Sequence, residues 1–111
     1  DRRHVFISGT ASINNKGEIM YPRDVVKQTC RMWENVEALL KEADCSYDDV
    51  AEMVVYLRDI ADYQTVLKLY EERFSDKPFV IVLAPVCRPG WLVEMECMAV
   101  KAQQKSDLPA F

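Results

Sequence analysis

The sequence predicts a single α+β domain, a two-layer sandwich in which two helices cover one face of a mixed β-sheet. Two stretches with the periodicity of amphipathic helices occur among apolar stretches typical of strands, in the order strand, helix, strand, helix, strand, strand. The chain has 111 residues, 50% of them hydrophobic, which is sufficient for one hydrophobic core. Because two helices cover only one face of a four-stranded sheet, we expect the other face to be open.

The first apolar stretch, residues 4–13, is rich in β-branched residues and predicts a strand. Gly9 interrupts it, and a glycine inside a strand commonly marks a bulge or a place where a ligand or another backbone segment comes close. Ser8 and Thr10 would present hydroxyl groups on one face, either to a ligand or simply to solvent.

Residues 22–43 carry apolar side chains at intervals of three and four, which predicts a long amphipathic helix. Pro22 suits the first helical position, because a proline lacks the N–H that would be unpaired there. We expect Cys30 to pack on the apolar side of this helix as a reduced thiol. The predicted apolar stripe comprises Val25, Val26, Cys30, Met32, Trp33, Val36, Leu39, Leu40 and Ala43.

Residues 50–57 are apolar nearly throughout, which predicts a strand in the interior of the sheet. Asp59 is suited to cap a second helix. Residues 79–83 and 91–101 predict the third and fourth strands, and we expect residues 102–111 to form a flexible tail outside the domain of residues 1–101. The predicted apolar stripe of the second helix comprises Ile60, Tyr63, Val66, Leu67, Tyr70 and Phe74.

The fourth strand alternates strictly, with one wholly apolar face and an opposite face that carries Glu94 and Glu96. The preceding loop, which includes Cys87 and Arg88, would bring a thiol and a guanidinium close to the start of this strand. A partly desolvated carboxylate beside these groups suits the binding and protonation of a small anion. The alternative is equally simple: glutamates are common on the wet face of a strand, and Arg-Pro-Gly is an ordinary turn.

Composition excludes several classes of function. The net charge is −4 and the sequence has no basic run, so we expect no nucleic-acid partner. One histidine and four cysteines without a Cys-x-x-Cys pair argue against a zinc site, and we expect neither a metal nor a cofactor. No segment has the length of a membrane span, and the cysteines have the placement of reduced thiols, so we expect a cytoplasmic protein with no membrane contact. The first residue is not Met, which indicates a processed chain or a piece of a longer one.

The sheet face without helices would expose Leu92, Met98 and part of residues 5–13. An apolar face of that size commonly marks an interface. We therefore expect a homo-oligomer closed by symmetry, with the region around Glu94 close to a subunit boundary.

Three segments, which together extend from about residue 4 to residue 100, resemble the RidA/YjgF family, whose members are also described as endoribonuclease L-PSP or translation initiation inhibitor. The resemblance implies a chorismate-mutase-like fold, a homotrimer with clefts between subunits, and hydrolysis of small enamines or imines. It also implies that Ser8, the adjacent Gly9 and Glu94 line the cleft, and that a short strand and a Tyr precede the first motif in other members. The segments are Phe6–Ala11, the run Tyr70-x-x-x-Phe74-x-x-x-Pro78, and Leu92–Ala99.

The chain departs from the family where its deaminases carry a carboxylate-binding Arg and, two residues later, a Cys: these positions hold Val80 and Val82. The run from Val86 to Glu96 is more similar to the C-terminal half of the chorismatases, which hydrolyse an enol ether. That second resemblance implies Glu94 as the catalytic acid and Cys87 as a pocket residue, with Arg88 in the same loop.

Three hypotheses follow. The first is a hydrolase of a small anionic metabolite, an enamine, imine or enol ether, with Glu94 as general acid, Arg88 as carboxylate anchor, and Cys87, Ser8 and Gly9 in the pocket. The second is a non-catalytic trimeric domain that binds a metabolite or has a structural role in a longer protein. The third, ribonuclease or translation-inhibitor activity, is least compatible with the acidic composition.

Overall fold

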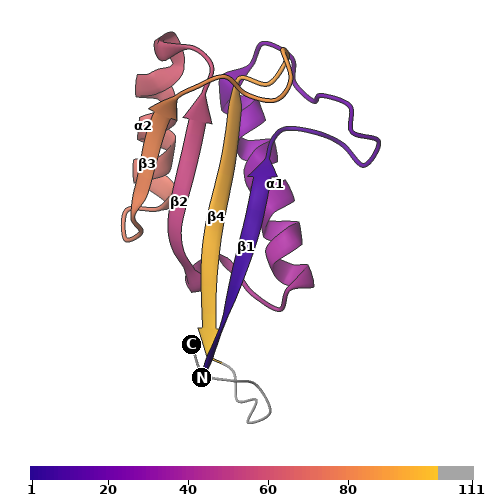
Figure 1. Cartoon of the computed structure of the whole chain (residues 1–111). Helices are drawn as coiled ribbons and strands as arrows, with labels where there is room; N and C mark the ends of the chain where they lie inside the picture. The colour runs from indigo at the N-terminus through magenta and orange to yellow at the C-terminus, as the bar shows by residue number, and fades with distance from the viewer. Residues whose placement is uncertain (103–111) are drawn as a thin grey trace.

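A computed structural model of the chain describes residues 1–102 and has two layers, a four-stranded sheet and two α-helices (Figure 1). The predicted α+β sandwich is therefore confirmed. Two short 3-10 helices, Tyr47–Asp49 and Ile60–Asp62, complete the regular structure. The main elements in chain order are β1 (Arg2–Thr10), α1 (Val25–Glu42), β2 (Val50–Leu57), α2 (Tyr63–Arg73), β3 (Phe79–Leu83) and β4 (Val93–Ala102).

The strand order across the sheet is β1-β4-β2-β3. β4 pairs antiparallel with both β1 and β2, whereas β2 pairs parallel with β3, so the sheet is mixed and β2 is interior, as predicted. Because β4 lies on the far side of β2 from β3, the chain after β3 has to pass over the end of β2 to reach β4. The segment 84–92 makes this crossing at one end of the sheet (Figure 1).

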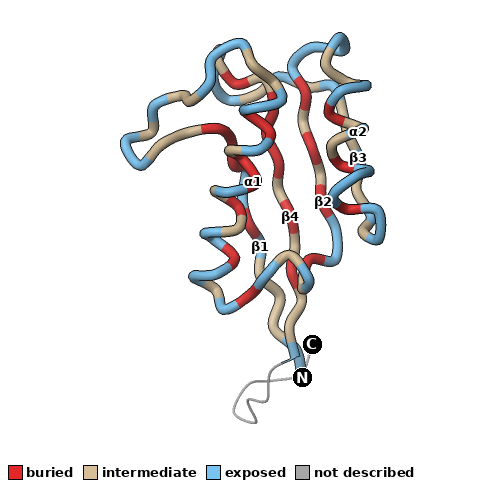
Figure 2. Tube along the Cα trace, turned by 180° about the vertical axis from the view of Figure 1, so that it is seen from behind, coloured by how far each residue is buried: buried red, intermediate tan, exposed pale blue. Residues whose placement is uncertain are grey.

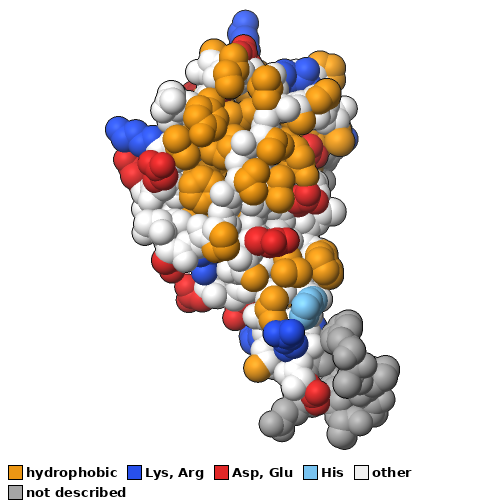
Figure 3. All heavy atoms as spheres, turned by 60° about the vertical axis from the view of Figure 1, so that its left-hand side comes forward, with side chains coloured by type: hydrophobic (Ala, Val, Ile, Leu, Met, Phe, Trp, Pro, Cys, Tyr) orange, Lys and Arg blue, Asp and Glu red, His pale blue; other side chains and the backbone are white. Residues whose placement is uncertain are grey.

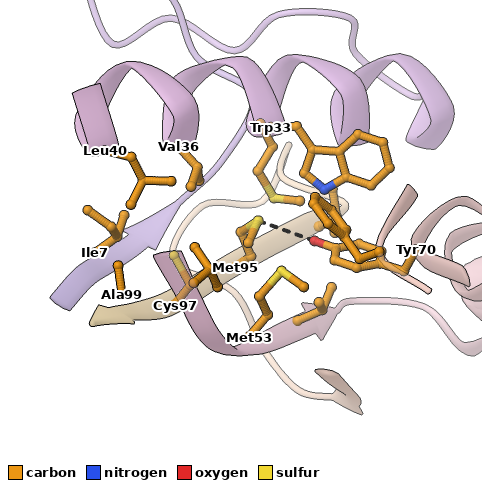
Figure 4. Close-up of a cluster of buried hydrophobic side chains, with 14 of the residues drawn as sticks. Ile7, Trp33, Val36, Leu40, Met53, Tyr70, Met95, Cys97 and Ala99 are labelled. Atoms are coloured by element: carbon orange, nitrogen blue, oxygen red, sulfur yellow. Dashed lines mark hydrogen bonds between the residues drawn. The ribbon is translucent and has the colours of Figure 1, made fainter. Parts of the chain in front are cut away.

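Both helices lie on the same face of the sheet, and the buried residues of the strands and helices meet between the two layers (Figure 2). Met32, Val36 and Leu40 of α1 are completely buried there, together with Met95 of β4. The hydroxyl of Tyr70 on α2 donates a hydrogen bond to the Met95 sulfur at 3.2 Å (Figure 4). The predicted inward face of β4 is thus the centre of the core.

The first helix begins three residues later than predicted. Asp24 is its N-cap and accepts a hydrogen bond from the Lys27 amide at 3.0 Å, whereas Pro22 lies in the turn before it. The residues on both sides of Pro22 have positive φ, 58° and 64°, which places the proline outside any helix. The prediction for Cys30 was also wrong: its side chain is exposed, because the buried stripe lies on the side of Gln28, Thr29, Met32, Trp33, Val36 and Leu40.

The second helix begins at Tyr63 rather than directly after Asp59, because Asp59 caps the 3-10 turn Ile60–Asp62 by accepting from the Ala61 amide at 2.9 Å. Ile60 was predicted in the core but is 65% exposed, because it precedes the α-helical turns that face the sheet. Val66 and Tyr70 are buried as predicted.

Strand boundaries differ from prediction at the ends of the sheet. β1 ends at Thr10 instead of Ile13, and β4 begins at Val93 instead of Trp91, although Trp91 is buried. β2 and β3 have the predicted bounds. The predicted flexible tail lies outside the described residues, apart from Ala102 at the end of β4.

The opposite face of the sheet carries no helix, and hydrophobic side chains gather there next to acidic ones (Figure 3). Phe6 on β1 is 74% exposed and Val80 on β3 is 49% exposed. Within residues 1–102 no helix has the length and apolar character needed to cross a bilayer. The open face expected from the sequence is therefore present, with polar and apolar residues on it.

Candidate functional site

The carboxyl group of Glu94 lies at the beginning of β4, on the open face of the sheet. Tyr56 of β2 is its cross-strand partner. Glu94 is nevertheless only 9% exposed. Burying a carboxylate costs free energy unless it has partners, so its surroundings identify what the position is built for.

Gly9 provides the space for this carboxyl group. A Cβ atom at Gly9 would lie 2.6 Å from Glu94 Oε1, closer than any side-chain carbon can approach. The pairing of β1 with β4 shifts register between Ile7 and Thr10, which is the irregularity predicted from the glycine. The group that approaches Gly9 most closely is the Glu94 side chain, rather than a ligand or another backbone segment.

Cys87 is the second close neighbour of Glu94. Its thiol donates to Glu94 Oε1 with a sulfur–oxygen distance of 3.6 Å, and its side chain is exposed. Cys87 belongs to the crossing segment 84–92, so a residue between β3 and β4 is folded back over the start of β4. The structure therefore brings a thiol, a carboxyl group and a glycine together in one corner of the open face.

Arg88, the predicted carboxylate anchor, has two partners within the chain. Its Nη1 donates to the Gly17 carbonyl at 2.6 Å, and its guanidinium lies 5.4 Å from the centre of the Trp91 ring. The side chain thus joins the crossing segment to the loop after β1. The bond to Gly17 uses one of the five N–H donors of the guanidinium.

Ser8 is exposed on β1, next to Gly9. It lies on the rim of two hollows, one on each side of the strand. The first, of about 350 Å³, is on the open face of the sheet and is lined by Phe6, Ser8, Glu52, Val54, Glu96 and Met98, among others. The second, of about 440 Å³, lies between the end of β1 and α1.

Tyr56 and Glu96 form a polar pair beside this corner. The Tyr56 hydroxyl donates a hydrogen bond to Glu96 Oε1 across the β2–β4 pair. Because the carboxylate holds the hydroxyl proton, the pKa of Tyr56 is raised above its usual value. The open face therefore has two adjacent glutamates with different partners, a thiol for Glu94 and a phenol for Glu96.

Two residues that the sequence analysis did not single out fix the crossing segment. Arg58, directly after β2, donates from Nε to the Trp91 carbonyl at 3.0 Å and from Nη2 to the Arg88 carbonyl at 2.7 Å. Gln28, completely buried on α1, donates to the Gly90 carbonyl at 3.2 Å. Gln28 lies one turn before the buried Met32, and a polar residue at that position of the helix could have been noticed in the sequence. No local pattern in the sequence distinguishes Arg58.

The two valines at the family's arginine and cysteine positions lie on β3, away from Gly9. Val80 pairs with Val54 of β2, and Val82 pairs with Tyr56. Among the described residues there is no group of three or more His, Cys, Asp or Glu side chains that could hold a metal ion. The groups that this site presents include the carboxyl groups of Glu94 and Glu96, the Cys87 thiol and the Tyr56 hydroxyl.

Comparison with known protein sequences finds relatives that share the name RutC. The chain is 33% identical over 99 residues to a RutC family protein of Pyrococcus abyssi, covering 87% of this chain and 78% of the relative. It is 28% identical over 97 residues to the 3-aminoacrylate deaminase RutC of Acinetobacter baylyi, covering 86% of this chain and 77% of that protein.

Solved structures agree with this relationship. A putative endoribonuclease of Thermotoga maritima superposes with a TM-score of 0.78 at 26% identity, covering 90% of this chain and 80% of that one. TdcF of E. coli, solved with bound serine, superposes with a TM-score of 0.76 at 28% identity, covering 89% and 81%. The family model described as endoribonuclease L-PSP matches residues 1–101. The chain therefore belongs to the endoribonuclease L-PSP family, the RidA/YjgF family that its motifs resemble.

Proposed function

We propose that this protein is a hydrolase of a small carboxylate-bearing enamine, imine or enol ether, with Glu94 as the general acid. The observation that carries the proposal is the Glu94 carboxyl group, which is nine-tenths buried on the open face against Gly9 and Cys87. Carboxyl groups act as general acids in enzymes, and this one is enclosed by residues of the open face rather than by water.

The proposed reaction on an enamine has three steps. Glu94 transfers its proton to the β-carbon, and the nitrogen lone pair forms the C=N bond of an iminium ion. Water then adds to the C=N carbon and returns a proton to the Glu94 carboxylate. The resulting carbinolamine expels ammonia, so the net change is enamine plus water to carbonyl compound plus ammonia.

An enol ether can follow the same route. Protonation of its terminal carbon gives an oxocarbenium ion, water adds, and the hemiketal releases an alcohol and leaves a ketone. Both substrates place positive charge next to the carboxylate that has just given up its proton. A buried carboxylate stabilises that charge more strongly than one in water.

The remaining site residues have roles in substrate binding under this proposal. Arg88 would anchor the substrate carboxylate with N–H donors that its bond to Gly17 leaves available, and Ser8, Gly9 and Cys87 would form the pocket wall. The 3-aminoacrylate deaminase and the serine-bound TdcF among the relatives support a small carboxylate-bearing ligand.

We propose that the protein works as a homotrimer in the cytoplasm. The open sheet face, with exposed Phe6 and Val80, supports burial against other subunits, and the hollow beside Ser8 and Glu96 would then lie at a subunit boundary. The buried thiols of Cys45 and Cys97 support a reducing environment.

A second candidate is a non-catalytic domain that binds a metabolite or has a structural role. The observation in its favour is the pair Val80 and Val82, which cannot hold a carboxylate as the family's arginine does. Under this hypothesis the group of Glu94, Gly9 and Cys87 is retained from the family but catalyses no reaction.

A turnover assay decides between the two candidates. The wild type, Glu94→Gln and Glu72→Gln are each supplied with 3-aminoacrylate or 2-aminoacrylate generated in situ, and with chorismate, and carbonyl product is measured. We expect Glu94→Gln to lose about 100-fold or more in rate, as for removal of a general acid. Glu72→Gln makes the same chemical change at an exposed position on α2 and should retain full rate.

Two outcomes of this assay contradict the proposal, and a separate RNA-cleavage assay of the wild type can give a third. Full activity of Glu94→Gln would exclude the proposed acid. Silence of the wild type on all three substrates would favour the non-catalytic domain. Cleavage of a labelled RNA by the wild type would favour the ribonuclease description of the family, which the net charge of −4 opposes.

A further inference from the structure

We infer that Arg58 is a positioning residue of this site: its guanidinium fixes the crossing segment 84–92 so that the Cys87 thiol meets the Glu94 carboxyl group. The inference deepens the proposed function, because Cys87 is a pocket residue there. The geometry that carries it does not depend on turnover.

The topology of the sheet creates the need for such a residue. The strand order β1-β4-β2-β3 forces the chain between β3 and β4 to pass over the end of β2. β2 ends at Leu57, and Arg58 is the next residue and is hydrogen-bonded to the crossing segment. A segment with no strand or helix of its own needs hydrogen bonds to other parts of the chain to keep one conformation.

Arg58 supplies three of these hydrogen bonds. Its backbone N–H donates to the Leu92 carbonyl at 3.2 Å, and its side chain donates to the carbonyls of Trp91 at 3.0 Å and Arg88 at 2.7 Å. The two side-chain bonds leave from different nitrogens of one planar group, and a charged donor makes each stronger than a neutral one. A lysine at this position would be a single point donor and would not hold both carbonyls in the same way.

The same segment is held from the other layer by Gln28. Its amide group donates to the Gly90 carbonyl and accepts from the Leu92 amide at 3.0 Å. Gln28 is completely buried, so its replacement would leave buried polar groups without partners and would damage the fold. Arg58 and Gln28 together form a clamp on the crossing segment. Arg58 is exposed, so its side chain can be replaced without damage to the fold.

The fixed points lie between the two reactive groups in sequence. Cys87 directly precedes Arg88, whose carbonyl accepts from the Arg58 side chain, and Glu94 lies two residues after Leu92, which is bonded to the Arg58 backbone N–H and to the Gln28 side chain. Loss of the Arg58 side chain removes its bonds to the Arg88 and Trp91 carbonyls and loosens residues 87 and 88, which keep the Trp91 N–H bond to the Arg88 carbonyl and the Arg88 bond to Gly17. Gln28 and the β4 ladder still fix Glu94. We therefore expect the thiol to leave the carboxyl group without movement of the strand.

The contact can be measured through the chemistry of the thiol. Iodoacetamide alkylates exposed cysteines, and peptide mass spectrometry gives the rate at Cys87 relative to Cys30, an exposed thiol on α1. The quantity of interest is the factor by which Glu94→Gln changes this relative rate. Residues in direct contact couple by about two-fold or more, so we expect at least that factor in the wild-type background.

The test repeats this measurement in the Arg58→Met background, which keeps the length of the side chain and removes its donors. In this background we expect Glu94→Gln to leave the relative rate at Cys87 unchanged. In the Arg58→Lys background the effect of Glu94→Gln should lie between its effects in the wild type and in Arg58→Met. Arg73→Met is the matched control. Arg73 is exposed, and its guanidinium lies 4.8 Å from the centre of the Trp33 ring, which does not belong to the crossing segment. Loss of the Arg73 side chain should lower the stability of the protein. It should leave the effect of Glu94→Gln on the relative rate at Cys87 unchanged.

Two results would overturn the inference. One is an unchanged coupling factor in Arg58→Met, and the other is a wild-type protein in which Glu94→Gln does not affect Cys87 at all. If the coupling is unchanged in Arg58→Met while its thermal midpoint falls, Arg58 has a purely structural role. None of these readouts requires turnover, so failure of the proposed hydrolase activity and failure of the Arg58 inference give different patterns.

Discussion

The ten residues of β4 form two faces, and the two faces differ in how their side chains are buried. The face toward the helices is apolar and buried, with Met95 in contact with the Tyr70 hydroxyl at its centre (Figure 4). On the other face Glu94 is also buried, and its carboxyl group lies against Gly9 and the Cys87 thiol. Burial on the first face comes from many dispersion contacts between apolar groups, whereas the Glu94 carboxyl group has specific partners.

This difference predicts different consequences of mutation. A core position loses stability in proportion to the volume removed, whichever apolar residue occupies it. A position at the Glu94 corner loses its geometry, and with it function, at little cost in stability. The following predictions test this contrast, from the largest effect on stability to the smallest.

Met95→Ala should have the largest effect. It removes a completely buried side chain and leaves a cavity beside Tyr70, which costs about 2–5 kcal/mol in the free energy of unfolding. Urea denaturation of the variant and of Glu94→Gln, its neighbour on the other face, measures the contrast directly. Equal destabilisation by the two changes would mean that the two faces do not differ as described.

Cys97 makes the stability of the core face dependent on pH. Burial raises the pKa of its thiol from 9.0 to about 11, so the native state favours the protonated form. This contribution is fully present below pH 9 and is lost as pH rises toward 11, by at most about 1.4 kcal/mol per pH unit. Unfolding free energies measured between about pH 8 and about pH 10 should fall less steeply in Cys97→Ala than in the wild type.

The exposed Cys30 is the control for this titration. Cys30→Ala should retain the wild-type slope because its side chain is not in the core. An identical slope in all three proteins would show that the Cys97 thiol does not titrate in this range.

Gly9→Ala should separate stability from function. The new methyl group would overlap Glu94 Oε1, but that oxygen is the end of a flexible side chain and can move. We expect a destabilisation of about 1 kcal/mol or less, the low end of overpacking costs. Since the carboxyl group is displaced but still present, any turnover that depends on Glu94 should fall about tenfold, less than the loss of about 100-fold or more expected when the general acid is removed.

The combination with Glu94→Gln tests this route of action. If Gly9→Ala acts through the carboxyl group, the double variant should be no slower than Glu94→Gln alone. A further loss in the double variant would mean that Gly9 has a separate role, such as direct contact with substrate.

Glu96→Gln should have the smallest effect, limited to one titration. The pKa of Tyr56 is raised chiefly by its hydrogen bond to the Glu96 carboxylate, so the variant should lower it toward the usual value. Absorbance at the phenolate band against pH, with Tyr56→Phe to identify the signal, measures the shift. An unchanged Tyr56 titration would contradict the pairing on the open face.

Much of the fold could be predicted from local patterns, and the exceptions have local causes. Alternation in β4 predicted which side chains are buried, and the continuous apolar run 50–57 predicted an interior strand. Periodicity failed where polar residues took core positions, as Gln28 and Thr29 did, and where a 3-10 turn replaced the first turn of α2 and exposed Ile60. Hydrophobic patterns do not register a buried amide whose partners lie elsewhere in the chain.

The site was predictable in part. The sequence marked Gly9, Cys87 and Glu94, and the structure brings these three together. It also marked Arg88, which in this structure is bound to Gly17. Arg58 escaped notice because its partners are backbone carbonyls, which every residue carries and no sequence pattern can distinguish.

By itself the sequence determined the element types, the apolar face of β4 and the membership of a family, because these depend on spacing within short segments. Only the tertiary structure decided that Gln28 and Arg58 hold a segment 30 to 64 residues away and that Gly9 makes room for Glu94. Such contacts depend on strand order and register, which place distant residues side by side. The crossing over β2 has that origin, and the corner around Glu94 is its consequence.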